Sequence, residues 1–158
     1  MTIRLNPLFG PIAALVSLAM TSAPALAQSV EQRQARGDAV IRSLNGGTPQ
    51  PVLERMRKEF PFLAEATEAY ALGDVWSRPG IDNRARQLAA VAAFAALGEP
   101  GFLKIHAGYA LNVGVTEEEL KEIVYLTTVT AGFPKAIAAS QALSELFAGR
   151  RAARAGGR

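Results

Sequence analysis

Cysteine is absent from this chain of 158 residues, and histidine occurs only once, as His106. Without cysteine the chain can form no disulfide, no metal–thiolate site and no thiol nucleophile. A single histidine without clustered carboxylates also argues against a transition-metal site, and we expect none. Acid–base chemistry near neutral pH is therefore expected at His106, the side chain best suited to it.

A strong net charge is also lacking. The chain has 17 Lys and Arg against 14 Asp and Glu, which leaves a formal charge of +3. The arginines form no stripe with interleaved aromatic residues, as would be typical of a nucleic-acid-binding face. We therefore expect no nucleic-acid partner.

The first 27 residues have the pattern of a secretory signal peptide. Arg4 supplies a positive start, Leu8–Met20 is an apolar run of about 13 residues, and Ala25-Leu26-Ala27 is a small-x-small cleavage site. That run is shorter than the roughly 20 residues that span a bilayer, so a transmembrane anchor is the weaker alternative. Cleavage would lower the charge from +3 to +2, because residues 1–27 hold one Arg and no acid. We predict a periplasmic or secreted protein without membrane association after cleavage.

The remaining sequence predicts an all-α protein, because helical periodicity recurs and no strand pattern does. Residues 28–149 are expected to form one domain of about six to seven helices, and residues 150–158 a disordered basic tail. Residues 83–97 include LAAVAAFAAL, which is apolar on every side and predicts a helix buried all round. We expect this helix to lie beside the helix of His106, and a second subunit to cover part of the apolar surface.

Residues 101–134 are predicted to form a helical hairpin at the centre of the fold. Its first helix, over residues 101–112, carries His106 on an apolar stripe with Phe102, Ile105, Tyr109 and Ala110. Gly114 is suited to end this helix, and Thr116 with Glu119 forms a capping box for the next.

A loop with the sequence GDVWSRPGID is predicted over residues 73–82, because Gly73, Pro79 and Gly80 disfavour helix. This loop carries Trp76 and Arg78. Asp82 is the expected N-cap of the following helix, whose first turns contain arginines and a glutamine.

Three motifs, taken together, resemble the carboxymuconolactone decarboxylase family, which includes the alkylhydroperoxidase D-like proteins. They are WSRPG with R-x-R-x-L downstream, H-x5-N-x-G-V-T-x-x-E, and G-F-P, in that order, within residues 32–147. The resemblance implies an alkylhydroperoxidase D-like helical fold, homo-oligomers such as trimers or hexamers, and no bound cofactor. It also implies decarboxylation or proton transfer on a small-molecule lactone or unsaturated carboxylate, as in the decarboxylation of 4-carboxymuconolactone.

The resemblance implies that His106 is the catalytic acid/base. Guanidinium groups can hold substrate carboxylates bidentately, a tryptophan can wall the pocket, and a glutamine can donate a hydrogen bond to a substrate carbonyl. The expected substrate-binding residues are Trp76, Arg78, Arg84, Arg86, Gln87 and Phe102. His106, Trp76 and the arginines also have a plainer structural alternative: a histidine or tryptophan packed in the core, and arginines paired with nearby acids or solvated.

Some positions depart from the family pattern. Phe102 and Gln87 stand where relatives often carry Cys or Glu, and Thr130 stands where Tyr commonly precedes A-G-F-P. Without cysteine, the thiol peroxidase activity found in the superfamily is not expected. The missing carboxylates motivate an alternative function, in which the protein binds a small acid in the periplasm without turning it over.

Overall fold

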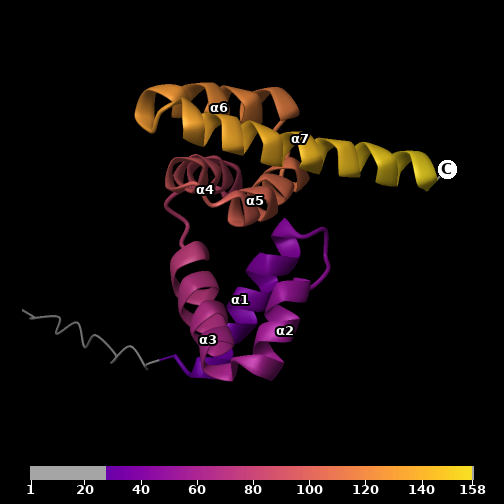
Figure 1. Cartoon of the computed structure of the whole chain (residues 1–158). Helices are drawn as coiled ribbons and strands as arrows, with labels where there is room; N and C mark the ends of the chain where they lie inside the picture. Colours follow the sequence, from indigo (N-terminus) through magenta and orange to yellow (C-terminus); the bar gives the residue numbers. More distant parts are fainter. Residues whose placement is uncertain (1–27, 158) are drawn as a thin grey trace, which may run out of the picture.

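The computed structural model describes residues 28–157, and within them every regular element is a helix (Figure 1). The elements are α1 (Val30–Leu44), α2 (Pro51–Glu59), α3 (Pro61–Glu65), the π-helix η1 (Ala66–Trp76), α4 (Asn83–Leu97), α5 (Pro100–Asn112), α6 (Glu117–Thr130) and α7 (Phe133–Gly156). The predicted all-α fold class is confirmed for the described residues. The predicted signal peptide, residues 1–27, lies outside the described residues.

The helix ends follow the capping residues in the sequence. The Asp82 carboxylate accepts a hydrogen bond from the N–H of Ala85 at 2.7 Å and so begins α4. Thr116 and Glu119 form the predicted reciprocal capping box of α6. Gly98 ends α4 with a φ of +78°, a left-handed conformation that glycine adopts without strain.

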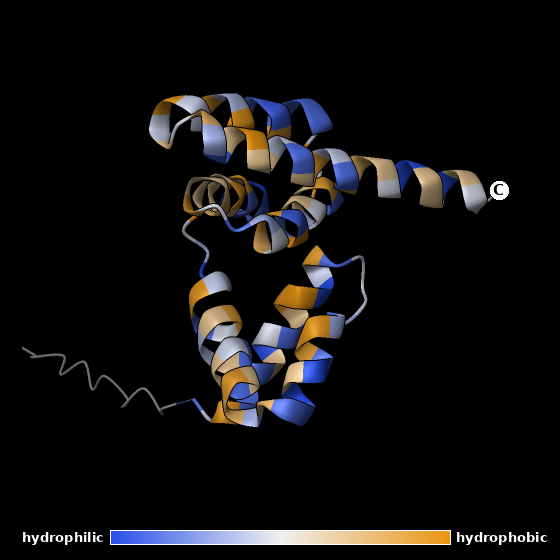
Figure 2. Cartoon of the chain, in the orientation of Figure 1, coloured by the Kyte–Doolittle hydropathy of each residue, from blue (hydrophilic) through white to orange (hydrophobic). Residues whose placement is uncertain are grey.

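The helices form two groups that meet at α5. In Figure 1, α1, α2 and α3 lie on one side, while α4 and α5 form a layer beneath α6 and α7. Hydrophobic and hydrophilic segments alternate along the helices of both groups (Figure 2). One core cluster is built from α4 to α7, and a second joins Ile41, Leu44 and Leu53 to Tyr109 of α5. Helix α5 therefore contributes to both cores.

Helices α5 and α6 follow one another in sequence, yet each packs mainly against α4 and α7. The expectation that α4 lies beside α5 is confirmed. Ala136, Ala139 and Ala142 are buried on α7, and such small side chains let this helix approach its neighbours closely. Residues 101–134 therefore form two consecutive helices joined by a short turn, as predicted. Their main packing partners are α4 and α7, and the two helices do not pack closely on each other.

The prediction that α4 is buried all round is wrong for the single chain. Gln87, Val91 and Ala95 are buried along one face, whereas Leu97 is 65% exposed at the end of the helix. Only one side of α4 meets α5, α6 and α7, so its other apolar residues remain exposed or half-buried.

Among residues 28–157, no helix combines the length and apolarity needed to cross a bilayer.

The prediction of a disordered tail from residue 150 is also wrong within the described residues, because α7 continues to Gly156. Arg150 donates a hydrogen bond to the Asn112 side chain at 3.1 Å, and Arg151 pairs with Glu117 at 3.4 Å. These contacts tie the last turns of α7 to α5 and α6.

The loop predicted from residue 73 instead begins after Trp76, where η1 ends. Gly73 is buried against the backbone of α1, and a Cβ there would lie 2.1 Å from the Arg33 carbonyl oxygen. Arg33 and Arg36 both bind the Asp74 carboxylate, at 2.7 and 2.9 Å. Gly73 therefore allows α1 and η1 to pack closely, and the ion pairs of Asp74 stabilise this contact. Helix η1 continues through Gly73 to Trp76.

Gly37 on α1 provides the matching close approach, since its Cβ would lie 2.1 Å from the carbonyl oxygen of Glu68. We predict that Gly37→Ala destabilises the protein by about 1–3 kcal/mol or more, because backbone atoms must move apart. Gly149→Ala is the matched control: it is helical with nothing within 4 Å of its Cβ. This control should be neutral or stabilising by up to about 1 kcal/mol. Urea unfolding of both variants tests the prediction, and equal stabilities would contradict it.

Candidate active site

His106 lies on α5 where the two helix groups meet, half-buried among aromatic rings. Its ring centroid is 5.0 Å from that of Phe94, 5.5 Å from Trp76 and 5.8 Å from Tyr109. These rings come from α4, the end of η1 and α5 itself. The surrounding surface is therefore apolar on several sides, although the imidazole is not sealed inside the core.

Gln87 reaches His106 from the neighbouring helix α4. The Gln87 side-chain oxygen Oε1 lies 2.9 Å from His106 Nδ1, within hydrogen-bond distance. Gln87 is 0% exposed, and its amide nitrogen Nε2 has no hydrogen-bond partner. Leaving a buried polar group unpaired costs roughly 1–3 kcal/mol. The unpaired amide nitrogen of Gln87, the residue that contacts His106, therefore lowers the free energy of unfolding.

Burial lowers the pKa of His106 to about 4, because the apolar surroundings disfavour the charged imidazolium. His106 is consequently neutral at physiological pH. A neutral imidazole offers one nitrogen as a proton acceptor, which suits it to begin a reaction as a base.

A cavity of about 270 Å³ opens beside His106. Three of its lining residues are polar or titratable, namely His106, Gln50 and Thr67, and no charged side chain is among the described lining residues. The complete lining is Gln50, Val52, Leu53, Met56, Leu63, Thr67, Phe102, Ile105 and His106. A volume near the lower end of ligand pockets indicates a small ligand.

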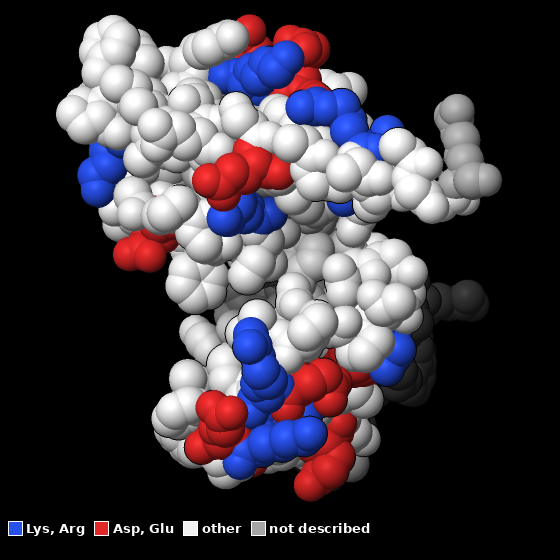
Figure 3. Space-filling model, turned by 45° about the vertical axis from the view of Figure 1, so that its right-hand side comes forward, with Lys and Arg blue, Asp and Glu red and all other residues white. Residues whose placement is uncertain are grey.

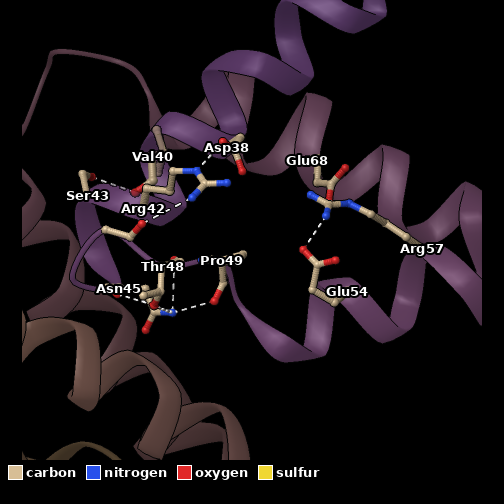
Figure 4. A network of polar contacts seen from close by, with 11 residues as sticks. Asp38, Val40, Arg42, Ser43, Asn45, Thr48, Pro49, Glu54, Arg57 and Glu68 are labelled. Atoms are coloured by element: carbon tan, nitrogen blue, oxygen red, sulfur yellow. Dashed lines mark hydrogen bonds and ion pairs between the residues drawn. The ribbon is translucent and has the colours of Figure 1, made fainter.

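Polar contacts hold the wall of this cavity in place. The Asn45 side chain donates to the carbonyl oxygens of Thr48 and Pro49, ordering the turn that leads to Gln50 (Figure 4). Arg57 of α2 binds Glu68 of η1 at 2.7 Å. The chain thereby positions Gln50, whose amide donates to the Tyr109 hydroxyl.

The structure brings only some of the predicted site residues together. Trp76 and Gln87 contact or approach His106, and Phe102 lines the cavity while 54% exposed. Sequence reasoning missed Gln50, Thr67 and Phe94. Gln50 and Thr67 lie far from His106 in sequence and carry no motif, so only the packing of α2 and η1 against α5 reveals them.

The three arginines expected to bind substrate, Arg78, Arg84 and Arg86, lie outside the His106 cavity. Arg84 forms an ion pair with Glu119, the Arg86 guanidinium donates to the Arg78 carbonyl oxygen, and Arg78 lines a separate open groove with Trp76. On the face shown in Figure 3, positive and negative side chains lie next to one another. The described chain therefore places no guanidinium in the lining of the His106 cavity, contrary to expectation.

Residues 28–157 contain no cluster of three or more His, Cys, Asp or Glu side chains that could hold a metal ion. Within the cavity lining, His106 is the side chain able to exchange a proton near neutral pH.

The family model and the named relatives that this chain resembles point to the same family. The family model described as "Carboxymuconolactone decarboxylase family" matches residues 61–145, more than half of the chain. A 4-carboxymuconolactone decarboxylase of Acinetobacter baylyi is 40% identical over 78 residues, which cover 49% of this chain and 58% of the relative. A nitrosuccinic acid decarboxylase of Metarhizium robertsii is 35% identical over 89 residues, covering 53% and 61%.

An uncharacterized protein of Methanocaldococcus jannaschii is 28% identical over 98 residues, covering 62% of this chain and 91% of the relative. The chain thus spans about three fifths of the length of the two decarboxylases that it matches.

We predict that His106 titrates near pH 4 and that its neutral form stabilises the fold. Between pH 6.5, its ordinary pKa, and about 4, the unfolded chain binds a proton that the folded chain does not. Stability supplied by His106 is therefore complete above pH 6.5 and is lost as the pH falls toward 4, by at most about 1.4 kcal/mol per pH unit.

NMR titration of this single imidazole gives the midpoint directly. Urea unfolding at pH 7, 6, 5 and 4 should show a shallower loss of stability for His106→Gln than for the unmodified chain. A midpoint near 6.5, or parallel pH profiles, would contradict the prediction.

Proposed function

The chain belongs to the carboxymuconolactone decarboxylase family, and we propose that it releases CO₂ from a small lactone or unsaturated carboxylate without a cofactor, using His106 as acid/base. The observation that carries this proposal is a neutral imidazole at the wall of a small, largely apolar cavity. The names of two relatives point the same way, since both are decarboxylases of small acids.

The proposed reaction begins with binding of the substrate carboxylate beside His106. Proton uptake from water converts the imidazole to imidazolium, which pairs with the carboxylate in the apolar cavity. The bond between the carboxyl carbon and the neighbouring carbon then breaks, CO₂ leaves, and the electron pair spreads into the conjugated carbonyl of the substrate. The imidazolium returns its proton to that carbon, so each turnover consumes one proton and regenerates neutral His106.

Apolar walls favour this reaction for a physical reason. The carboxylate of the bound substrate concentrates its charge on two oxygens, whereas the enolate that forms spreads charge over several atoms. Burial destabilises a concentrated charge more than a dispersed one. Val52, Leu53, Met56, Ile105 and Phe102 provide such walls.

We further propose that the protein is exported and acts as a homo-oligomer, such as a trimer or hexamer. Export is supported by the signal-peptide pattern of residues 1–27. Self-association is supported by large apolar side chains left exposed on α4, α6 and α7, namely Leu97, Leu126, Val129, Phe133 and Ile137.

A second candidate function is binding of a small acid without turnover. The specific observation in its favour is that no side-chain carboxylate lines the cavity among the described residues. A protein of this kind would keep the pocket but lack a proton relay.

We expect purified protein to release CO₂ from 4-carboxymuconolactone, measured by NMR of the product. His106→Ala should lower kcat by about 10²- to 10⁴-fold, the usual contribution of a positioned acid/base. Gln141→Ala, an exposed position on α7, is the control and should retain full activity. Equal turnover by His106→Ala would remove His106 from the mechanism. A rise in melting temperature with the lactone, without product, would favour the binding function.

A further inference from the structure

We propose that Gln87 sets the tautomer of His106, so that Nδ1 carries the proton at rest and Nε2 presents its lone pair to the cavity. Gln87 then acts as a positioning residue, in place of the substrate contact expected from sequence. The mechanistic meaning of this inference rests on the proposed function, whereas the tautomer itself can be measured without any substrate.

The geometry around Nδ1 supports the assignment. The atom of Gln87 that faces Nδ1 at 2.9 Å is the amide oxygen Oε1. An amide oxygen accepts hydrogen bonds and cannot donate them, so the nitrogen opposite it must carry the hydrogen. In a neutral imidazole with a protonated Nδ1, Nε2 is unprotonated.

The surroundings of Nε2 complete the argument. None of the described residues forms a hydrogen bond with His106 Nε2, and the buried polar atoms without partners are Trp76 Nε1 and Gln87 Nε2. Within residues 28–157, Nε2 is therefore neither bonded nor sealed, and His106 is a lining residue of the cavity. A ligand entering the cavity meets a hydrogen-bond acceptor, and thus must arrive with a proton or draw one from water.

The charged groups near this site are neutralised elsewhere. Glu68, which follows the cavity-lining Thr67, is paired with Arg57, and Arg84, one turn before Gln87, is paired with Glu119. Tyr109 is the titratable group in contact with the ring, and burial raises the pKa of its hydroxyl, so it stays neutral.

The neutral amide of Gln87 fixes the ring without attracting a second proton. A glutamate in the same place would form an ion pair with the imidazolium and favour the doubly protonated ring. The choice of amide over carboxylate at residue 87 therefore makes the resting site a base.

The test uses the full chain labelled with ¹⁵N and long-range ¹H–¹⁵N correlation spectra at pH 7. Because the sequence contains one histidine, every imidazole signal belongs to His106. We expect Nδ1 to show the chemical shift of a protonated ring nitrogen and Nε2 that of an unprotonated one. The opposite pattern would mean that the Gln87 amide donates to Nδ1, and it would overturn the proposal.

Two variants separate positioning from packing. Gln87→Leu keeps a similar volume but removes the acceptor, so the spectra should shift toward the Nε2-protonated tautomer. Gln87→Glu should raise the titration midpoint of the ring by about 1–3 pH units, because a carboxylate then faces Nδ1. Gln141→Leu on the exposed side of α7 is the matched control and should leave both readings unchanged.

An unchanged tautomer in Gln87→Leu, or an unchanged midpoint in Gln87→Glu, would overturn the role assigned to Gln87. If Gln87→Leu does not fold, the spectra of the unmodified chain and of Gln87→Glu decide the question alone. These readings are independent of turnover, so a failure to release CO₂ would contradict the proposed function and leave the tautomer assignment standing.

Discussion

The hydrogen bond between Gln87 and His106 joins α4 to α5 at the point where the two hydrophobic cores meet. Helix α5 is packed on one side against α4 and α7, and on the other against α1 and residues near it. A side chain at this junction is held by both groups yet still borders a cavity. That combination gives an imidazole a defined orientation and access to a ligand.

The same position determines the electrostatics of the site. Aromatic rings from three helices displace water from around His106, and this desolvation lowers its pKa. Of the arginines that the motifs suggested as substrate ligands, Arg84 pairs with Glu119, Arg86 donates to a backbone carbonyl, and Arg78 lines a separate groove. The site therefore differs from a cationic clamp: its lining is largely apolar, with His106, Gln50 and Thr67 as the polar residues.

Close packing in the other helix group supports the cavity wall. Gly37 and Gly73 bring the backbones of α1 and η1 together, and Arg33 and Arg36 lock Asp74 across the contact. This arrangement carries Trp76 to the end of η1, where its ring reaches His106. The two glycines thus allow close contact between α1 and η1, the helix that ends at Trp76.

Local sequence determined the helical class, the capping of α4 and α6, and the presence of His106 on a partly apolar face, because these features depend on residues within one or two turns. The motif order also determined the family. Tertiary structure alone decided which residues share the site: it brought Gln50, Thr67 and Phe94 to the histidine and kept the arginines away. It also extended η1 to Trp76 and α7 to Gly156. These outcomes depend on contacts and ion pairs between helices distant in the chain, which no local pattern encodes.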